Sequence, residues 1–87
     1  MNWSDEARRI LDSLVMELPL PVRDGVRQAA EFRAEAVTTE AGADQVLLET
    51  AVRAFIEATP PDLRQRLKHS LAFHGIDPEE YEAAFDT

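Results

Sequence analysis

Few side chains in this 87-residue sequence are suited to binding a metal or transferring a proton, and His69 and His74 are the first to consider. They lie five residues apart. A four-residue spacing would place two imidazoles on one metal ion from a single helix face. Asp62 and Asp77 lie nearby in the sequence, but nothing in their spacing requires them to join a site. The sequence therefore predicts no metal site.

Other reactive chemistries are equally unsupported. The sequence has no cysteine, which excludes thiolate catalysis, cysteine metal ligands and disulfides. Its 17 Asp and Glu residues are scattered, and no two of them stand out as an acid and a base. Ser4, Ser13 and Ser70 lie in no nucleophile motif, and the three glycines are isolated and form no phosphate-binding loop. We therefore expect no enzyme activity and no cofactor.

Composition restricts the partners and the location. The net charge of −8 argues against direct binding to a nucleic-acid backbone, which needs concentrated Lys and Arg. No apolar run approaches the roughly 18 residues of a membrane span, and the start MNWSDEARR lacks the basic and apolar regions of a signal peptide. With 45% hydrophobic and 30% charged residues, the composition is that of an ordinary globular domain. We expect a soluble cytoplasmic protein without a membrane or nucleic-acid partner.

Apolar periodicity and helix-end signals predict an all-α fold. Apolar residues recur at helical spacing after Ser4, a favourable N-cap, and Pro19 and Pro21 end this first helix. Gly42 and Gly75 each follow a helical run and are suited to ending it. We expect one domain, residues 1–87, folded as a small bundle of four to five helices around a long second helix. The expected helices are residues 4–18, 21–41, 44–58, 60–73 and 78–85.

The third expected helix is the most hydrophobic, and Asp44 is its expected N-cap. It carries two adjacent apolar stripes, one of which consists of Leu48, Val52 and Ile56. A helix with two apolar stripes either lies centrally in the fold or shows one stripe to a partner. Burial is the favoured interpretation. The alternative makes these three residues a surface for a protein partner or a homodimer.

Charged residues in the second expected helix suggest a structural role. Arg23, Arg27 and Glu31 lie four residues apart and therefore share one helix face. Arg27 and Glu31 are spaced to pair along the helix. Arg23 is placed to reach Glu17 or the carbonyl end of the first helix. We favour a structural clamp at the proline turn over a binding role.

Two further features have structural interpretations. Arg64, Arg66 and Lys68 form the one basic patch in the chain, which is interpreted as solvated charge in preference to a binding site. Trp3 precedes the first helix and is interpreted as a packing anchor, with ligand stacking as the alternative.

An ordered set of residues between positions of about 3 and 55 matches the pattern of a known family. The matching residues, in order, are Trp3, Glu6, Ala7, Leu18, Pro19, Val22, Arg23, Gly25, Arg27, Glu31 and Ala34, with Gly42, Val46 and Glu49 as further matches. With these residues the sequence resembles the small C-terminal domain of the B subunit of light-independent protochlorophyllide reductase. The departure is Leu47, which stands where threonine is usual in that family. The resemblance divides the domain into a family-like core, residues 3–58, and a C-terminal helical extension, residues 59–87.

The resemblance implies an accessory role. In the reductase this domain is an appendage, and the iron–sulfur and catalytic residues lie elsewhere. We therefore expect a non-catalytic protein-interaction or accessory module, in the context of a tetrapyrrole or nitrogenase-like redox enzyme. One alternative is a protein that binds a small apolar or tetrapyrrole ligand between helices, lined by Trp3, Tyr81 or His74, although no specific motif supports a tetrapyrrole. Another is an acidic mimic of nucleic acid that occupies a basic partner.

Overall fold

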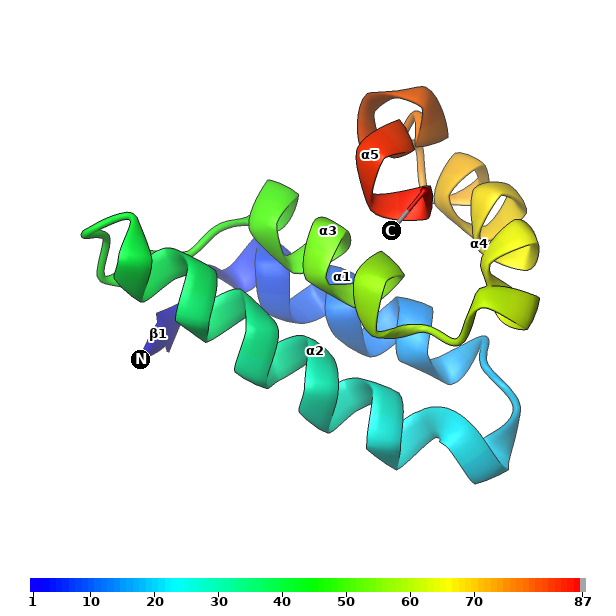
Figure 1. Ribbon diagram of the computed structural model, residues 1–87, viewed down its shortest axis with the longest axis horizontal. Coiled ribbons are helices and arrows are strands. Elements are labelled where there is room, and N and C mark those ends of the chain that lie inside the picture. The colour runs from blue at the N-terminus through cyan, green and yellow to red at the C-terminus, as the bar shows by residue number, and fades with distance from the viewer. Residues whose placement is uncertain (87) are drawn as a thin grey trace.

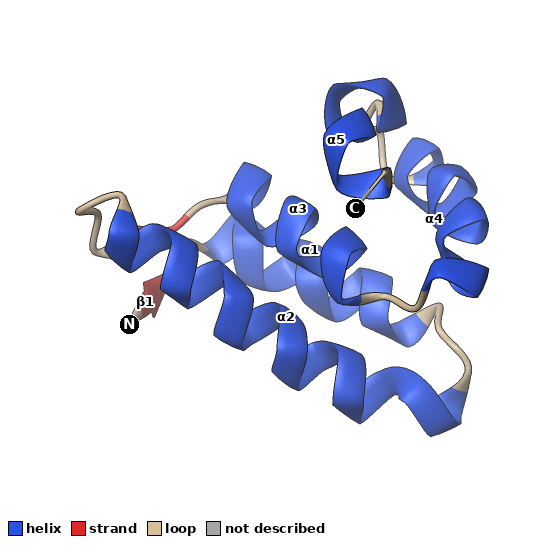
Figure 2. Cartoon of the chain, in the orientation of Figure 1, coloured by secondary structure: helices blue, strands red, loops and turns tan. Residues whose placement is uncertain are grey.

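The computed structural model of the chain describes residues 1–86 (Figure 1). Helices make up nearly all of its regular structure, so the expected all-α bundle is confirmed (Figure 2). Within the described residues, no helix is both long enough and apolar enough to cross a membrane. The elements are β1 (Asn2–Trp3), α1 (Asp5–Met16), α2 (Leu20–Glu40), β2 (Gln45–Val46), α3 (Leu48–Ala58), α4 (Pro61–Phe73), the 3-10 helix η1 (Pro78–Tyr81) and α5 (Glu82–Phe85).

Helices α1 and α2 form an antiparallel hairpin (Figure 1). The 21-residue α2 runs along one side of the molecule with α1 beside it, and α4 and α5 lie at one end (Figure 1). Helix α3 packs against α1, α2 and α5, so it lies at the centre of the bundle. Its apolar residues account for much of the hydrophobic core. The fully buried side chains of α3 include Val52, Phe55 and Ile56.

Local signals set most of the helix ends. The Ser4 hydroxyl accepts a hydrogen bond from the Ala7 amide at 3.0 Å, as expected of an N-cap. Gly42 and Gly75 have φ values of 76° and 77°, a left-handed conformation that glycine adopts without steric cost. Pro19 is the N-cap of α2, one residue before its first turn. These ends lie within about two residues of the expected ones.

The expected start of the third helix was wrong. Helix α3 begins at Leu48, and Asp44 does not cap it. The intervening Gln45–Val46 is extended and pairs in parallel with Asn2–Trp3, and the Ser4 amide donates to the Val46 carbonyl at 2.9 Å. The Val46 side chain is fully buried, so packing and this backbone pairing together favour the extended conformation over a further helical turn. The last expected helix differs in a smaller way, since residues 78–81 form a 3-10 turn before α5.

Candidate functional site: the helix α1–α2 contacts and the outer face of α2

The apolar stripe proposed as a partner surface is not on the surface. Val52 and Ile56 are both 0% exposed, and Leu48 is half-buried against the same core. These side chains face the neighbouring helices because α3 lies at the centre of the bundle. The partner-surface hypothesis for Leu48, Val52 and Ile56 is therefore corrected, and the favoured interpretation, burial, describes the stripe.

Arg23 spans the turn between α1 and α2. Its Nε donates to the Leu18 carbonyl at 2.8 Å, and its Nη2 donates to the Met16 carbonyl at 2.7 Å. These carbonyls lie at the end of α1 and just beyond it, where a helix leaves acceptors without partners. Such a contact joins the two helices at the proline turn, in keeping with the structural-clamp interpretation.

The same contact occurs a second time, at Arg64. Its Nε donates to the Thr59 carbonyl at 3.0 Å and its Nη2 to the Glu57 carbonyl at 3.1 Å. In both cases the arginine follows an N-cap proline by four residues and reaches the carbonyls five and seven residues before it. We call this arrangement the arginine clasp.

The second clasp changes the interpretation of the basic patch. Arg64 is only 8% exposed, so it is not the solvated charge that the sequence suggested. The signal that could have found it is the spacing of Pro60 and Arg64, which repeats that of Pro19 and Arg23.

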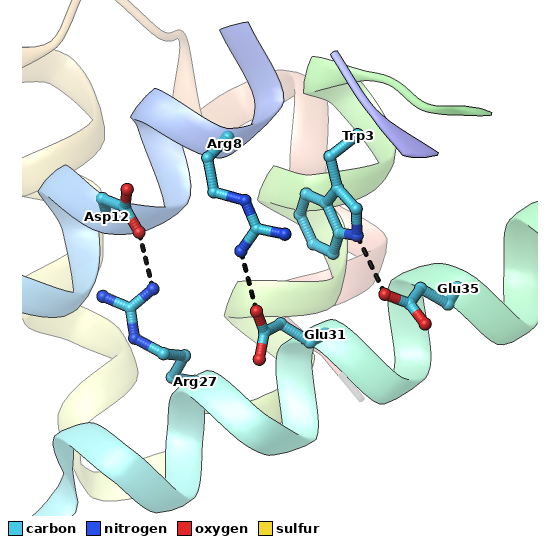
Figure 3. Close-up of polar contacts among 6 residues, drawn as sticks. All are labelled: Trp3, Arg8, Asp12, Arg27, Glu31 and Glu35. Carbon is cyan, nitrogen blue, oxygen red and sulfur yellow. Dashed lines mark hydrogen bonds and ion pairs between the residues drawn. The ribbon is translucent and has the colours of Figure 1, made fainter. Parts of the chain in front are cut away.

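Three polar contacts join α2 to the N-terminal segment and α1 (Figure 3). We call these contacts the polar ladder. They join Arg27 to Asp12 at 2.5 Å, Glu31 to Arg8 at 2.7 Å, and Glu35 to the Trp3 indole nitrogen at 2.9 Å.

The polar ladder corrects the pairing expected within α2. Arg27 and Glu31 do not pair with each other but with two different residues of α1. Four-residue spacing places them on one face, and the antiparallel α1 offers each an opposite charge on that same side (Figure 3).

The ion pairs of the polar ladder are expected to contribute little to stability. The Arg8 and Glu31 side chains are 41% and 31% exposed, and solvent screens a pair of this kind. A double-mutant cycle with Arg8→Gln and Glu31→Gln should give a coupling energy below about 1 kcal/mol. Urea denaturation would measure it, and the coupling should shrink at high salt. A coupling that is large and independent of salt would contradict this expectation.

The residues suggested as a ligand site lie in separate environments. The Trp3 indole bonds to Glu35, and the Arg8 guanidinium carbon lies 4.4 Å from the centre of its ring. His74 Nε2 lies 2.6 Å from a Glu17 carboxylate oxygen. Tyr81 is buried, and burial, with Glu49 and Glu80 adding to it, raises the pKa of its phenol above the usual 10. Each side chain has its own contacts, so the structure does not gather Trp3, His74 and Tyr81 around one ligand.

Metal-binding side chains do not converge either. Among residues 1–86, no group of three or more His, Asp or Glu side chains is arranged to hold a metal ion. His69 lies one turn before His74 and lines a different cavity.

The outer face of α2 is an uncharged strip on the surface of the molecule. We define it as a strip of seven exposed positions along one side of α2, which is flanked by the exposed charged residues Asp24, Arg33 and Glu40. None of the residues in the strip is charged, although 30% of the sequence is. Phe32 lies at the middle of this face and is 78% exposed. The outer face consists of Pro21, Gly25, Gln28, Ala29, Phe32, Ala36 and Thr39.

A hollow of about 480 Å³ lies beside Phe32. Phe32, Ala36 and Thr39 line it from the outer face, Met1 lines it from the N-terminal segment, and Glu35 and Glu40 complete it. The outer face thus has an apolar projection and a recess next to each other. The alanines of α2 are divided between its two sides, since Ala30 and Ala34 are buried while Ala29 and Ala36 are exposed.

The comparisons with known proteins identify a family whose function is unknown. A family model described as a protein of unknown function, DUF2621, matches residues 1–85. The chain therefore belongs to the DUF2621 family. No curated protein and no solved structure matches it.

Proposed function

We propose that this DUF2621 chain is a non-catalytic protein-interaction module that docks through the outer face of α2. The observation that carries the proposal is the absence of charge along this face. A helix side exposed to water normally carries charged residues, whereas this one places a 78% exposed phenylalanine among small and uncharged residues. Small residues allow a second helix to approach closely.

We propose a second copy of the chain as the occupant. A two-fold interface uses the same patch on both copies, so that patch must be complementary to itself. The outer face meets this requirement, because Phe32 of each copy can enter the hollow beside Phe32 of the other. None of the seven outer-face residues is charged, so the only carboxylates beside the docked Phe32 are Glu35 and Glu40 at the edge of the hollow, and Glu35 already accepts a hydrogen bond from Trp3.

The biological context in this proposal rests on the resemblance to the protochlorophyllide reductase domain. An accessory role beside a tetrapyrrole or nitrogenase-like redox enzyme is proposed on that ground alone. A cytoplasmic location is proposed from the composition and the N-terminal sequence. Several of the matching residues, including Trp3, Arg23 and Glu31, belong to the polar ladder or to a clasp. They support the fold of the module, and the outer face is left to bind a partner.

Self-association tests the proposal. Sedimentation velocity over a range of concentrations should show a monomer–dimer equilibrium for the wild type. Phe32→Gln should weaken the dimer by about 2 kcal/mol or more, as for a central interface residue. Phe73→Gln is the matched control, because Phe73 is 80% exposed on α4, and it should leave the equilibrium unchanged. Added salt should strengthen the dimer by screening Glu35 and Glu40 of the two copies.

Two results would overturn the proposal. One is a monomer at every concentration and salt level. The other is a dimer that Phe32→Gln and Phe73→Gln weaken equally, since the contact would then lie outside the outer face.

The ligand-binding and nucleic-acid-mimic alternatives have their own tests. A flat Trp3 fluorescence response to a porphyrin titration would remove a tetrapyrrole ligand near Trp3. A mimic of nucleic acid predicts a complex with a basic partner whose affinity falls steeply with salt, opposite to the salt response of the proposed dimer.

A further inference from the structure

A second recess lies between the α1–α2 turn and α4. It is a cavity of about 500 Å³, within the range of small-molecule sites. On one side it is lined by Glu17, Leu18 and Pro19. On the other side the lining comes from a single face of α4, at helical spacing, with His69 beside it. The α4 residues that line the cavity are Leu63, Arg66, Leu67, His69 and Ser70.

The cavity has an apolar floor. Leu18 and Leu67 are 5% and 3% exposed and belong to the hydrophobic core. Leu63, half-buried, and Pro19 add apolar surface around them. This floor suits the hydrocarbon part of a ligand, since the area it would cover is removed from water.

The polar groups that α4 contributes to the cavity can all donate hydrogen bonds, although the chain carries a net charge of −8. Arg66 supplies a guanidinium, His69 a ring nitrogen and Ser70 a hydroxyl. The single acidic residue in the lining, Glu17, is already bonded to His74 at 2.6 Å.

The three residues of the basic patch noted in the sequence thus have different contacts in the structure. Arg64 forms a clasp, Lys68 lies over the Phe85 ring, and Arg66 lines the cavity. The cavity shares no lining residue with the outer face of α2, so a ligand here is independent of the proposed dimer.

We infer that this cavity binds an amphipathic carboxylate, a molecule with an apolar body and one carboxylate head. The leucines contact the apolar part of the ligand. Arg66, whose guanidinium is a planar fork of N–H donors, binds the carboxylate. A guanidinium binds a carboxylate through two parallel hydrogen bonds, which are stronger than bonds between neutral groups. His69 and Ser70 are placed to add donors beside it.

Titration with decanoate tests the inference. Amide chemical shifts in ¹H–¹⁵N spectra should change first at the α4 residues of the cavity, such as Leu63, Leu67 and Ser70. Decanol, which keeps the body and lacks the charge, should bind about tenfold more weakly, and acetate, which lacks the body, should not bind measurably.

Arg66→Gln should reduce decanoate affinity about tenfold and leave decanol affinity unchanged. Arg66 is exposed, so this variant should fold normally. Arg53→Gln is the control, because Arg53 is exposed on α3 and lines a different cavity. It should bind decanoate as the wild type does.

Three results would overturn the inference. They are a decanoate titration that shifts no cavity amide, a decanol affinity equal to that of decanoate, and an equal effect of Arg66→Gln and Arg53→Gln on decanoate binding. Phe32→Gln should retain decanoate binding, so failure of the dimer proposal and failure of this inference can be told apart.

Discussion

Replacing Phe55 with alanine is expected to lower the free energy of unfolding by about 3–5 kcal/mol. The Phe55 side chain is 0% exposed and is the largest fully buried one in the described chain. It lies on α3, which packs against three other helices, so the surrounding backbone has little freedom to close the cavity. A domain of this length is expected to have a total stability of about 4–13 kcal/mol. The substitution therefore removes a large part of it.

Guanidinium denaturation followed by circular dichroism would measure this loss. Phe73→Ala is the matched control, since the same deletion at an 80% exposed position should change stability by no more than about 0.5 kcal/mol. If the two substitutions destabilised the protein equally, the central position of α3 would be contradicted.

Arg64→Ala is expected to have the second largest effect, about 2–3 kcal/mol. The substitution leaves the Thr59 and Glu57 carbonyls without their hydrogen bonds to a charged donor, in a region where the arginine is 8% exposed. Arg64→Lys should recover only part of the loss, because a single ammonium cannot reproduce the two bonds of the guanidinium fork. Urea denaturation of both variants would measure these values.

Arg23→Ala serves as an internal comparison. It breaks the same type of clasp, but its bond to the Met16 carbonyl is exposed, so the loss should be about 1 kcal/mol. Arg53→Ala, at an exposed position outside either clasp, should change stability by at most about 0.5 kcal/mol. An Arg64→Ala variant as stable as Arg53→Ala would show that the clasp does not stabilise the fold.

Local sequence signals were sufficient to predict the helices and most of their ends. Apolar periodicity, the Ser4 cap and the two terminating glycines act over a few residues, so they can be recognised without a structure. The start of α3 depended instead on the pairing of Gln45–Val46 with Asn2–Trp3, which lie far away in the sequence. No short-range pattern announces such a pairing, and the sequence around Val46 is compatible with either a helix or a strand.

The same distinction applies to the candidate site. The reach of Arg23 to the end of α1 spans only seven residues, and the sequence was enough to propose it. The partners of Arg27 and Glu31 lie 15 and 23 residues away, so the local spacing suggested the wrong pair. Whether the Leu48, Val52 and Ile56 stripe or the outer face of α2 meets solvent depends on where every other helix packs. Apolar periodicity alone does not show which face of a helix is covered by its neighbours.

The two arginine clasps have a consequence for how such turns are encoded. The bonds that form each clasp go to main-chain oxygen atoms, which every amino acid possesses. The side chains that follow each proline, Leu20 to Val22 and Pro61 to Leu63, supply none of these bonds. Each corner thus depends on a proline and an arginine four residues later, and the clasp places no requirement on the three side chains between them. This four-residue spacing between a proline and an arginine can be searched for in other helical sequences, where it would indicate an arginine clasp between consecutive helices.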